Sequence, residues 1–253
     1  MNTHEACLDQ FYDLLARLEK VYGGKRRLAG CHGQMDWPKR GVYFFFEDGE
    51  FRSDGTTPRV VRVGTHGLRK SSATLWSRLS QHRGSVSGSM PGGGNHRGSI
   101  FRLHVGSALL ASGHWSDSIR HSWAFGSNAP SDVRREEYPL ELAVSQHIGS
   151  MPFLWLEVDD PPSSMSDRGV IETGAIALLS VSKRQGIEDS STGWLGRQAD
   201  RDLVRESGLW NVNHVQEESN DRFLDVFERH LGLVSNRVQR GAPAEEAQND
   251  REA

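Results

Sequence analysis

Two apolar runs separated by a turn-rich segment constrain the fold of this chain more than any other feature. The first run is GVYFFFE at residues 41–47, and the second is RVVRVGT at residues 59–65. Both are rich in the β-branched and aromatic residues that favour strands. The residues between them, DGEFRSDGTTP, are typical of turns. The pattern therefore predicts a β-hairpin.

Other segments have the periodicity of helices or the composition of short strands. Over residues 4–22 apolar side chains recur at helical spacing, and Gly23-Gly24 can end that helix. The segment GSVSGSMPGGGNHRGS at residues 84–99 is rich in glycine and serine and predicts a mobile surface loop. We further expect helices over 71–84, 138–149 and 166–180, a last helix around Phe223, Phe227 and Leu231, and strands over 99–106 and 152–158.

These elements predict one α+β domain. Its centre is a small mixed or antiparallel sheet, built on the hairpin and the 99–106 strand and flanked by helices. The domain is expected to span residues 1–234. Residues 235–253, SNRVQRGAPAEEAQNDREA, lack apolar periodicity and are predicted to form a disordered tail.

Composition argues against membrane, secreted and zinc-binding classes. The mean hydropathy is -0.57, and no run approaches the roughly 18 apolar residues of a membrane span. The first residues lack the pattern of a signal peptide. Cys7 and Cys31 are the only cysteines, and no CxxC, HExxH or HxH spacing occurs. We therefore expect a cytoplasmic protein without a structural zinc site.

Charge is distributed unevenly along the chain, although the net charge is only -3. Between Gly55 and Ser116 there is no aspartate or glutamate. Such a one-sided block attracts polyanions, and the planar guanidinium suits bidentate contact with phosphate. Nucleic acid or a phosphate ligand is the expected partner. The basic residues of this block are Arg59, Arg62, Arg69, Lys70, Arg78, Arg83, Arg97 and Arg102, with five histidines beside them.

Arg78 and His82 lie four positions apart in the predicted 71–84 helix, which Ser71 or Ser72 can cap. Residues at this spacing share a helix face, and two positive charges there cost about 0.2–0.5 kcal/mol. Two interpretations stand at this point: a pair of solvated surface groups, or a site for an anion. A bound phosphate would offset the repulsion between Arg78 and a charged His82.

Four features now follow one another along the chain: Gly41-Val42-Tyr43 opening a strand, Val63-Gly64 closing its partner, LWSRLSQH on a helix, and VIETGAIALL on a later helix. Their order resembles the GIY-YIG nuclease superfamily over residues 41–180, which would form the core of the domain. The later segments TGWLGR and SGLWNVNHV resemble the branch of this superfamily that includes restriction endonucleases.

The resemblance implies an endonuclease that hydrolyses phosphodiester bonds in DNA with Mg²⁺ or Mn²⁺. It assigns the metal to Glu172, phosphate binding to Arg78, and handling of the water proton to Tyr43 together with His82. A carboxylate is a suitable ligand for such hard cations, and histidine is suited to proton transfer near neutral pH. Cutting both strands with one active site calls for two protomers, as in a homodimer, or for two binding events.

Further contacts to nucleic acid are expected from Arg62, Arg69, Lys70 and Arg83 in the basic block. The 84–99 loop has two interpretations. It is either a plain flexible loop or a flap that brings His96 and Arg97 to phosphates.

Two positions depart from the family pattern. The second motif tyrosine is replaced by Arg62, which can contact phosphate but cannot relay a proton in the same way. No asparagine occurs from Thr173 to Gln198, where the family has one; Ser190, Asn211 and Asn213 are the candidates to replace it. Two alternatives therefore stay open: a degenerate relative that binds nucleic acid without cleaving it, and a module that binds a small phosphate.

Overall fold

The computed structural model describes residues 3–69, 72–163 and 165–241. Within these residues one antiparallel sheet has the strand order β1-β4-β2-β3. The strands are β1 (Arg26–Arg27), β2 (Gly41–Phe51), β3 (Pro58–Gly64) and β4 (Pro152–Glu157). The α-helices are α1 (Thr3–Tyr22), α2 (Leu75–Arg83), α3 (Ile100–Ser112), α4 (Asp117–Ser122), α5 (Ser131–Ser150), α6 (Asp167–Arg184), α7 (Asp202–Ser207) and α8 (Arg222–Gly241), and the short 3-10 helices are η1 (Leu28–Gly30), η2 (His96–Gly98) and η3 (Leu195–Gln198).

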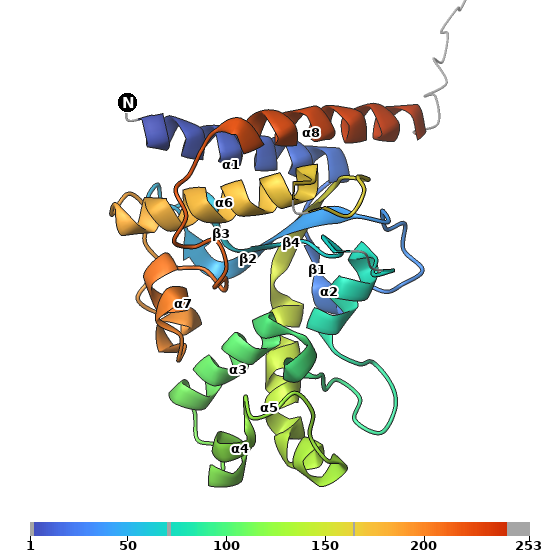
Figure 1. The fold of residues 1–253 in the computed structure, drawn as a ribbon, viewed down its shortest axis with the longest axis vertical. Coiled ribbons are helices and arrows are strands. Elements are labelled where there is room, and N and C mark those ends of the chain that lie inside the picture. The colour runs from blue at the N-terminus through green and yellow to red at the C-terminus, as the bar shows by residue number, and fades with distance from the viewer. Residues whose placement is uncertain (1–2, 70–71, 164, 242–253) are drawn as a thin grey trace, which may run out of the picture.

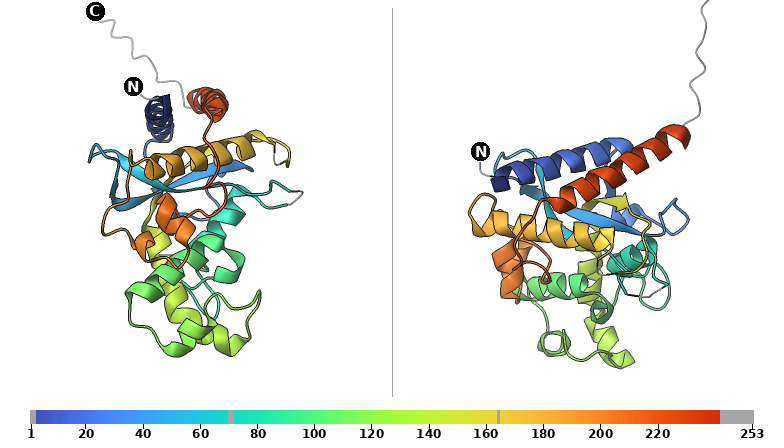
Figure 2. Two further views of the ribbon diagram at one scale, coloured as in Figure 1. Left: turned by 60° about the vertical axis from the view of Figure 1, so that its left-hand side comes forward. Right: turned by 45° about the horizontal axis from the view of Figure 1, so that its top comes forward.

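Helices cover both faces of the sheet. Figure 1 shows α1, α6 and α8 on one side of it and α2, α3, α4 and α5 on the other. In the left view of Figure 2, α1 and α8 are seen nearly end on, above α6 and the sheet. The expected α+β class, with a sheet flanked by helices, is confirmed.

Strand β2 divides the hydrophobic core because its side chains alternate between the two faces. Val42, Phe44 and Phe46 pack into the core formed with α1, α6 and α8. Tyr43 and Phe45 pack into the second core, formed with α2, α3 and α5. The candidate residue Tyr43 therefore belongs to the side of the sheet that carries α2.

The predicted hairpin is confirmed. Strands β2 and β3 pair antiparallel, with Tyr43 opposite Gly64 and Phe44 opposite Val63. On the other side of β2, strand β4 pairs with it antiparallel and places Trp155 opposite Tyr43. The predicted 152–158 strand is thus at the centre of the sheet.

The predicted strand over residues 99–106 is wrong, because these residues open helix α3. A short window shows an alternation that suits a strand, but the apolar residues Phe101, Val105 and Ala108 are spaced for one face of a helix. The Ser99 side chain caps the helix by accepting the backbone N–H of Arg102. The sheet is therefore completed by β4 and β1 and not by this segment.

Two further boundaries differ from the predictions. Helix α5 begins seven residues earlier than expected, at Ser131, because its first turns are polar and carry no apolar repeat. Helix α8 runs to Gly241, so residues 235–241, predicted as part of a disordered tail, are helical. Residues 242–253 lie outside the part of the chain that the structure describes. Among the described helices, none combines the length and the apolar character needed to cross a lipid bilayer.

Candidate active site

The candidate site begins at the end of the hairpin, where Tyr43 faces Gly64 across the two strands. The phenol ring lies directly against this glycine, and a β-carbon built at residue 64 would be 2.4 Å from the Tyr43 hydroxyl. Real β-carbons do not approach an atom so closely. Gly64 is therefore required for the ring of Tyr43 to occupy its position over the strand.

The Tyr43 hydroxyl forms a hydrogen bond with His82, and both side chains are fully buried. The distance from the phenol oxygen to Nε2 of His82 is 2.9 Å. The other ring nitrogen, Nδ1, lies 2.9 Å from the hydroxyl of Ser99. Both nitrogens of the imidazole thus have a partner of their own.

His82 is neutral at pH 7, which corrects the expectation of a charged pair with Arg78. Burial is the main cause that holds the pKa of His82 well below its ordinary value, and the positive charges of Arg78, Arg62 and Arg102 lower it further. The repulsion expected from the helical spacing is therefore absent. A phosphate is not needed to explain why the two residues share a helix.

Arg78 lies on the exposed flank of α2, whose buried stripe includes Leu75 and Leu79. The helix is capped by Thr74, whose side chain accepts the N–H of Ser77. The sequence predicted a cap at residue 71 or 72. Residue 72 lies before the cap and does not serve as one, and residue 71 lies outside the described residues. The half-buried Arg78 side chain reaches solvent, so its guanidinium is accessible to an anion.

Glu172 lies on α6, where a carboxylate oxygen accepts the backbone N–H of Thr65 at 3.0 Å. Thr65 follows Gly64 directly, so the bond ties α6 to the end of the motif strand. Burial raises the pKa of the Glu172 carboxyl above its ordinary value, against the opposing effect of that hydrogen bond and of the Arg62, His214 and Arg78 charges. The carboxylate is therefore poorly solvated.

Arg62 occupies β3 between these groups. Its guanidinium donates a hydrogen bond to the carbonyl of Trp210 and stacks over Phe101, 4.8 Å from the ring centroid. Burial lowers the pKa of Arg62, while the nearby Tyr43 and Glu172 raise it in part. Arg62, which replaces the second motif tyrosine, is thus a buried cation beside both Tyr43 and Glu172.

Comparison with known families now identifies the domain. The sequence model described as the GIY-YIG domain matches residues 2–236. The chain belongs to the GIY-YIG domain family. Domains of this family are in general nucleases. The comparisons with curated proteins and with solved structures found no match.

The sequence did not show which of Ser190, Asn211 and Asn213 contacts the GIY-YIG strand. Asn211 is buried and uses both ends of its amide on Val63: the side-chain oxygen accepts the Val63 N–H at 3.1 Å, and the nitrogen donates to the Val63 carbonyl at 2.8 Å. Of the three candidates for the family asparagine, Asn211 is therefore the one against the motif strand. The only sequence signal was the segment SGLWNVNHV.

The remaining basic residues are less concentrated than expected. Arg69 is exposed. Arg83 donates to the carbonyl of Cys31 and lies 5.0 Å from the centroid of the Trp76 ring. Lys70 lies outside the described residues. Of these three, only Arg69 is both described and freely accessible.

His96 and Arg97 do not face solvent as a flap would require. Both Arg97 terminal nitrogens bind the Glu137 carboxylate, at 2.6 and 2.8 Å, and His96 contacts Glu141 at 2.9 Å. The loop that carries them is anchored at its base, where the amide of Ser85 donates to the carbonyl of Gly93. We therefore do not retain these two residues as phosphate contacts. Their acidic partners lie 40 to 45 residues away, which local sequence patterns do not show.

A metal at this GIY-YIG site would have Glu172 as its protein ligand. Within the described ranges, no group of three or more His, Cys, Asp or Glu side chains is arranged to hold a metal ion. Mg²⁺ in phosphate chemistry commonly takes one or two carboxylates and fills its shell with water and substrate oxygens. A single half-buried carboxylate, open on one side to incoming groups, therefore fits a metal that is bound together with the substrate.

Proposed function

We propose that this GIY-YIG protein is a divalent-metal-dependent endonuclease that hydrolyses phosphodiester bonds in DNA. The observation that carries the proposal is the convergence of a buried tyrosine–histidine pair with a desolvated carboxylate and two arginines. The pair is Tyr43 and His82, 2.9 Å apart. The carboxylate is Glu172, and Arg62 and Arg78 act electrostatically on both it and His82.

Hydrolysis of a phosphodiester needs an acceptor for the proton of water and a means to neutralise the charge on phosphorus oxygens. Arg78 binds the phosphate, since it is the cation of the site that reaches solvent. Arg62 adds its positive charge from the buried side of the site. The Tyr43–His82 pair accepts the proton of the attacking water as the oxygen–phosphorus bond forms and the bond to the leaving oxygen breaks.

Tyr43 is fully buried in the substrate-free protein, so the site must adjust before water reaches its hydroxyl. Arg62 lies beside that hydroxyl and is itself held by the carbonyl of Trp210 and the ring of Phe101.

Glu172 would hold the divalent cation, which when bound would supply positive charge to neutralise the phosphate and to favour loss of a proton from water. Burial disfavours the charged form of this carboxylate, and a cation restores the balance.

DNA is the proposed substrate because the basic block from Gly55 to Ser116 contributes both β3 and α2 to the site. Glutamates from outside the block pair with three of its arginines: Glu50 with Arg59, Glu137 with Arg97 and Glu141 with Arg102. Arg69 and Arg78 are the members that we assign to the DNA backbone, since both are at least partly accessible.

The test is nicking of supercoiled plasmid by the purified protein with Mg²⁺, with Mn²⁺ or with EDTA. We expect cleavage that needs the metal and that Glu172→Gln abolishes. Glu136→Gln is the matched control, because Glu136 is an exposed carboxylate on helix α5, outside the motif segments. Cleavage in EDTA, or full activity of Glu172→Gln, would rule out the proposal.

A second candidate function rests on Arg62. Since an arginine stands where the family has its second tyrosine, the protein is alternatively a nucleic-acid-binding relative without cleavage. Retardation of DNA on a gel with no nicking under any metal condition would favour this candidate. A third outcome, no affinity for oligonucleotides, would point to a small phosphate ligand.

A further inference from the structure

A cavity of about 740 Å³ lies between the 84–99 loop and helices α2 and α5. Most of its wall residues are half-buried or exposed, so the cavity opens to solvent. Its volume is in the range of roughly 300–1,000 Å³ that sites for small ligands have in proteins. A double helix is much too wide for such a space, whereas a single nucleotide is of suitable size. From the helices it is lined by Gln81 and Arg83 of α2 and by Arg134, Glu137, Tyr138 and Glu141 of α5.

The loop that forms the other wall is held in a defined position. The backbone N–H of Ser85 donates to the carbonyl of Gly93, and that of Gly92 donates to the carbonyl of Ser85, both at 2.7 Å. The Tyr138 hydroxyl donates to the carbonyl of Pro91 at 2.6 Å, which ties the loop to α5. The cavity is therefore built by specific contacts between the loop and the helix.

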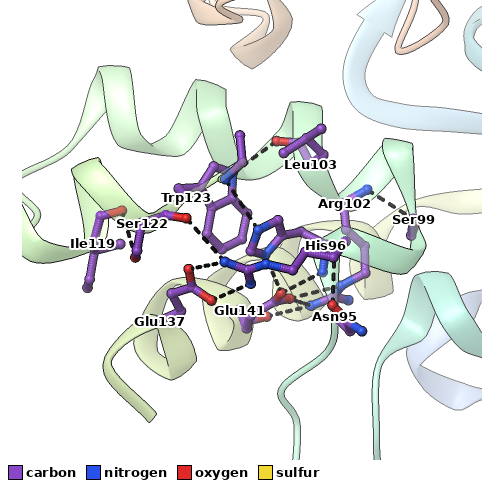
Figure 3. Close-up of polar contacts among 12 residues, drawn as sticks. Asn95, His96, Ser99, Arg102, Leu103, Ile119, Ser122, Trp123, Glu137 and Glu141 are labelled. Carbon is purple, nitrogen blue, oxygen red and sulfur yellow. Dashed lines mark hydrogen bonds and ion pairs between the residues drawn. The ribbon is translucent and has the colours of Figure 1, made fainter. Parts of the chain in front are cut away.

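The acidic residues of the lining, Glu137 and Glu141, are occupied by neighbouring cations and donors, as the dashed lines in Figure 3 show. Both terminal nitrogens of Arg97 bind the Glu137 carboxylate, at 2.6 and 2.8 Å. One oxygen of Glu141 accepts from His96, and the other accepts from Arg102. Neither carboxylate is left to accept a hydrogen bond from a ligand.

Two side-chain amides of the lining, in contrast, keep a free donor. The oxygen of the Gln81 amide accepts from Arg78 at 3.0 Å, and the oxygen of the Asn95 amide accepts the backbone N–H of Arg97 at 3.1 Å. Among the residues that the structure describes, the two amide nitrogens have no hydrogen-bond partner. An amide nitrogen only donates, so both groups are suited to a ligand that carries acceptors.

Arg83 and Arg134 add positive charge to the lining. Neither forms an ion pair with an acidic residue of the described ranges, since Arg83 binds the carbonyl of Cys31 and Arg134 binds the carbonyl of Ala129. Nε of Arg83 is buried without a hydrogen-bond partner there. The cavity thus presents donors and uncompensated positive charge, which complement an anionic ligand rich in acceptors. A nucleotide, with its phosphate and the acceptors of its base, has this chemistry.

Arg78 connects the cavity with the candidate active site. Its guanidinium lies 3.0 Å from the side-chain oxygen of Gln81 and 3.5 Å from the carbonyl of Gly98, and both of these residues line the cavity. A phosphate bound by Arg78 would therefore stand at the edge of the cavity. The next nucleotide of the same strand is the part of the DNA nearest to it.

We propose that this cavity binds one unpaired nucleotide of the DNA, next to the phosphate held by Arg78. The proposal rests on the proposed function for its substrate, and it adds that the substrate is read with one nucleotide outside the base stack. Taking a paired nucleotide out of the stack costs free energy, and an already unpaired one avoids most of that cost. The protein should therefore prefer DNA that carries an unpaired nucleotide.

The test compares two labelled DNA duplexes that differ only in a single unpaired nucleotide. Their affinities for the full chain are measured by fluorescence anisotropy in EDTA, where no metal-dependent cleavage occurs. We expect the wild type to bind the bulged duplex at least about 10-fold more tightly than the paired one.

Two conservative variants then probe the free donors. Gln81→Glu and Asn95→Asp keep the oxygens that Arg78 and the Arg97 N–H use, but replace each free donor with a negatively charged acceptor. Each should remove the preference for the bulged duplex. Gln185→Glu is the matched control and should keep that preference, because Gln185 is exposed at the C-terminal end of α6 and does not line the cavity.

Equal affinity of the wild type for the two duplexes would overturn the proposal, and so would an unchanged ratio of affinities in either variant. Binding of thymidine monophosphate without affinity for either duplex would also overturn it and would indicate a small phosphate ligand. A preference for the bulged duplex in a protein that nicks no plasmid would reject the proposed nuclease function and would support the assignment of the cavity.

Discussion

The hydroxyl of Tyr43 lies 2.9 Å from Nε2 of His82, although the two residues are 39 positions apart in the chain. Strand β2 supplies the first and helix α2 the second, and both side chains are buried in the same core. The contact is the most specific chemical feature of the site. Its removal should therefore affect catalysis far more than folding.

Tyr43→Phe should reduce the rate of plasmid nicking by about 100-fold to 10,000-fold, the range of a lost general base. The ring stays in place, but Nε2 of His82 loses its buried partner, so the free energy of unfolding should fall by about 1–3 kcal/mol, less than the effect on catalysis. Tyr12→Phe is the control, because the Tyr12 hydroxyl is also buried and accepts the Val60 N–H, but it belongs to the opposite core. Equal rates for Tyr43→Phe and the wild type would contradict the assignment of Tyr43.

Gly64→Ala should abolish cleavage and also destabilise the protein. A β-carbon at this position meets the Tyr43 ring, with three atoms of that ring system at 2.4 to 2.7 Å, so the phenol must move. Overpacking of this kind costs about 1–3 kcal/mol in the free energy of unfolding, measured by urea denaturation. Gly232→Ala on α8, where a β-carbon meets no atom within 4 Å, should keep both activity and stability.

Glu172→Gln should stabilise the protein at neutral pH while it removes activity. Because burial raises the folded pKa of this acid, the unfolded chain ionises first as the pH rises, and wild-type stability falls through that range. The variant lacks this effect and should unfold at a higher urea concentration above the folded pKa. Below the unfolded pKa the difference should vanish. A variant less stable than the wild type at neutral pH would contradict the desolvation of Glu172.

His104→Leu should stabilise the protein more in acid than at neutral pH. Burial lowers the pKa of His104 to about 4, and neither ring nitrogen has a hydrogen-bond partner within the described structure. Since the unfolded histidine takes up its proton near its ordinary pKa, wild-type stability is lost as the pH falls from there toward the folded value. At about pH 5 the additional gain from the substitution should be about 2 kcal/mol. His114→Leu, at an exposed position, should show no pH-dependent difference in urea denaturation.

Patterns that are local in the chain predicted their elements correctly. Apolar, β-branched and aromatic residues along β2 and the turn residues after it predicted the hairpin, and the apolar repeat from Cys7 to Tyr22 predicted α1. The strand prediction for residues 99–106 is wrong because a few residues of a buried helix and of a strand have similar sequence patterns. The repeat is recognisable only when the window extends to Ala108 and beyond.

Partners distant in sequence were beyond local patterns. The sequence predicts Arg97 as a phosphate contact because the block around it has no acid, yet Glu137 binds it from α5. The sequence also predicts a charged His82, because nothing local shows that this side chain is buried. In the same way, Asn211 could not be chosen over its competitors until the fold brought it to Val63. The order of the motifs indicated the family, whereas the charge and the partners of each side chain depended on how the chain packs.

The alternation of side chains along β2 has a consequence for mutation by insertion or deletion. Val42 and Phe44 point into one core and Tyr43 into the other, so a shift of one residue would exchange the two sets. Because both sets of side chains are hydrophobic, each core would accept the residues of the other set. The phenol, however, would leave His82 for the far side of the sheet. Removal of a single codon within this strand would therefore disable the site even if the protein still folded.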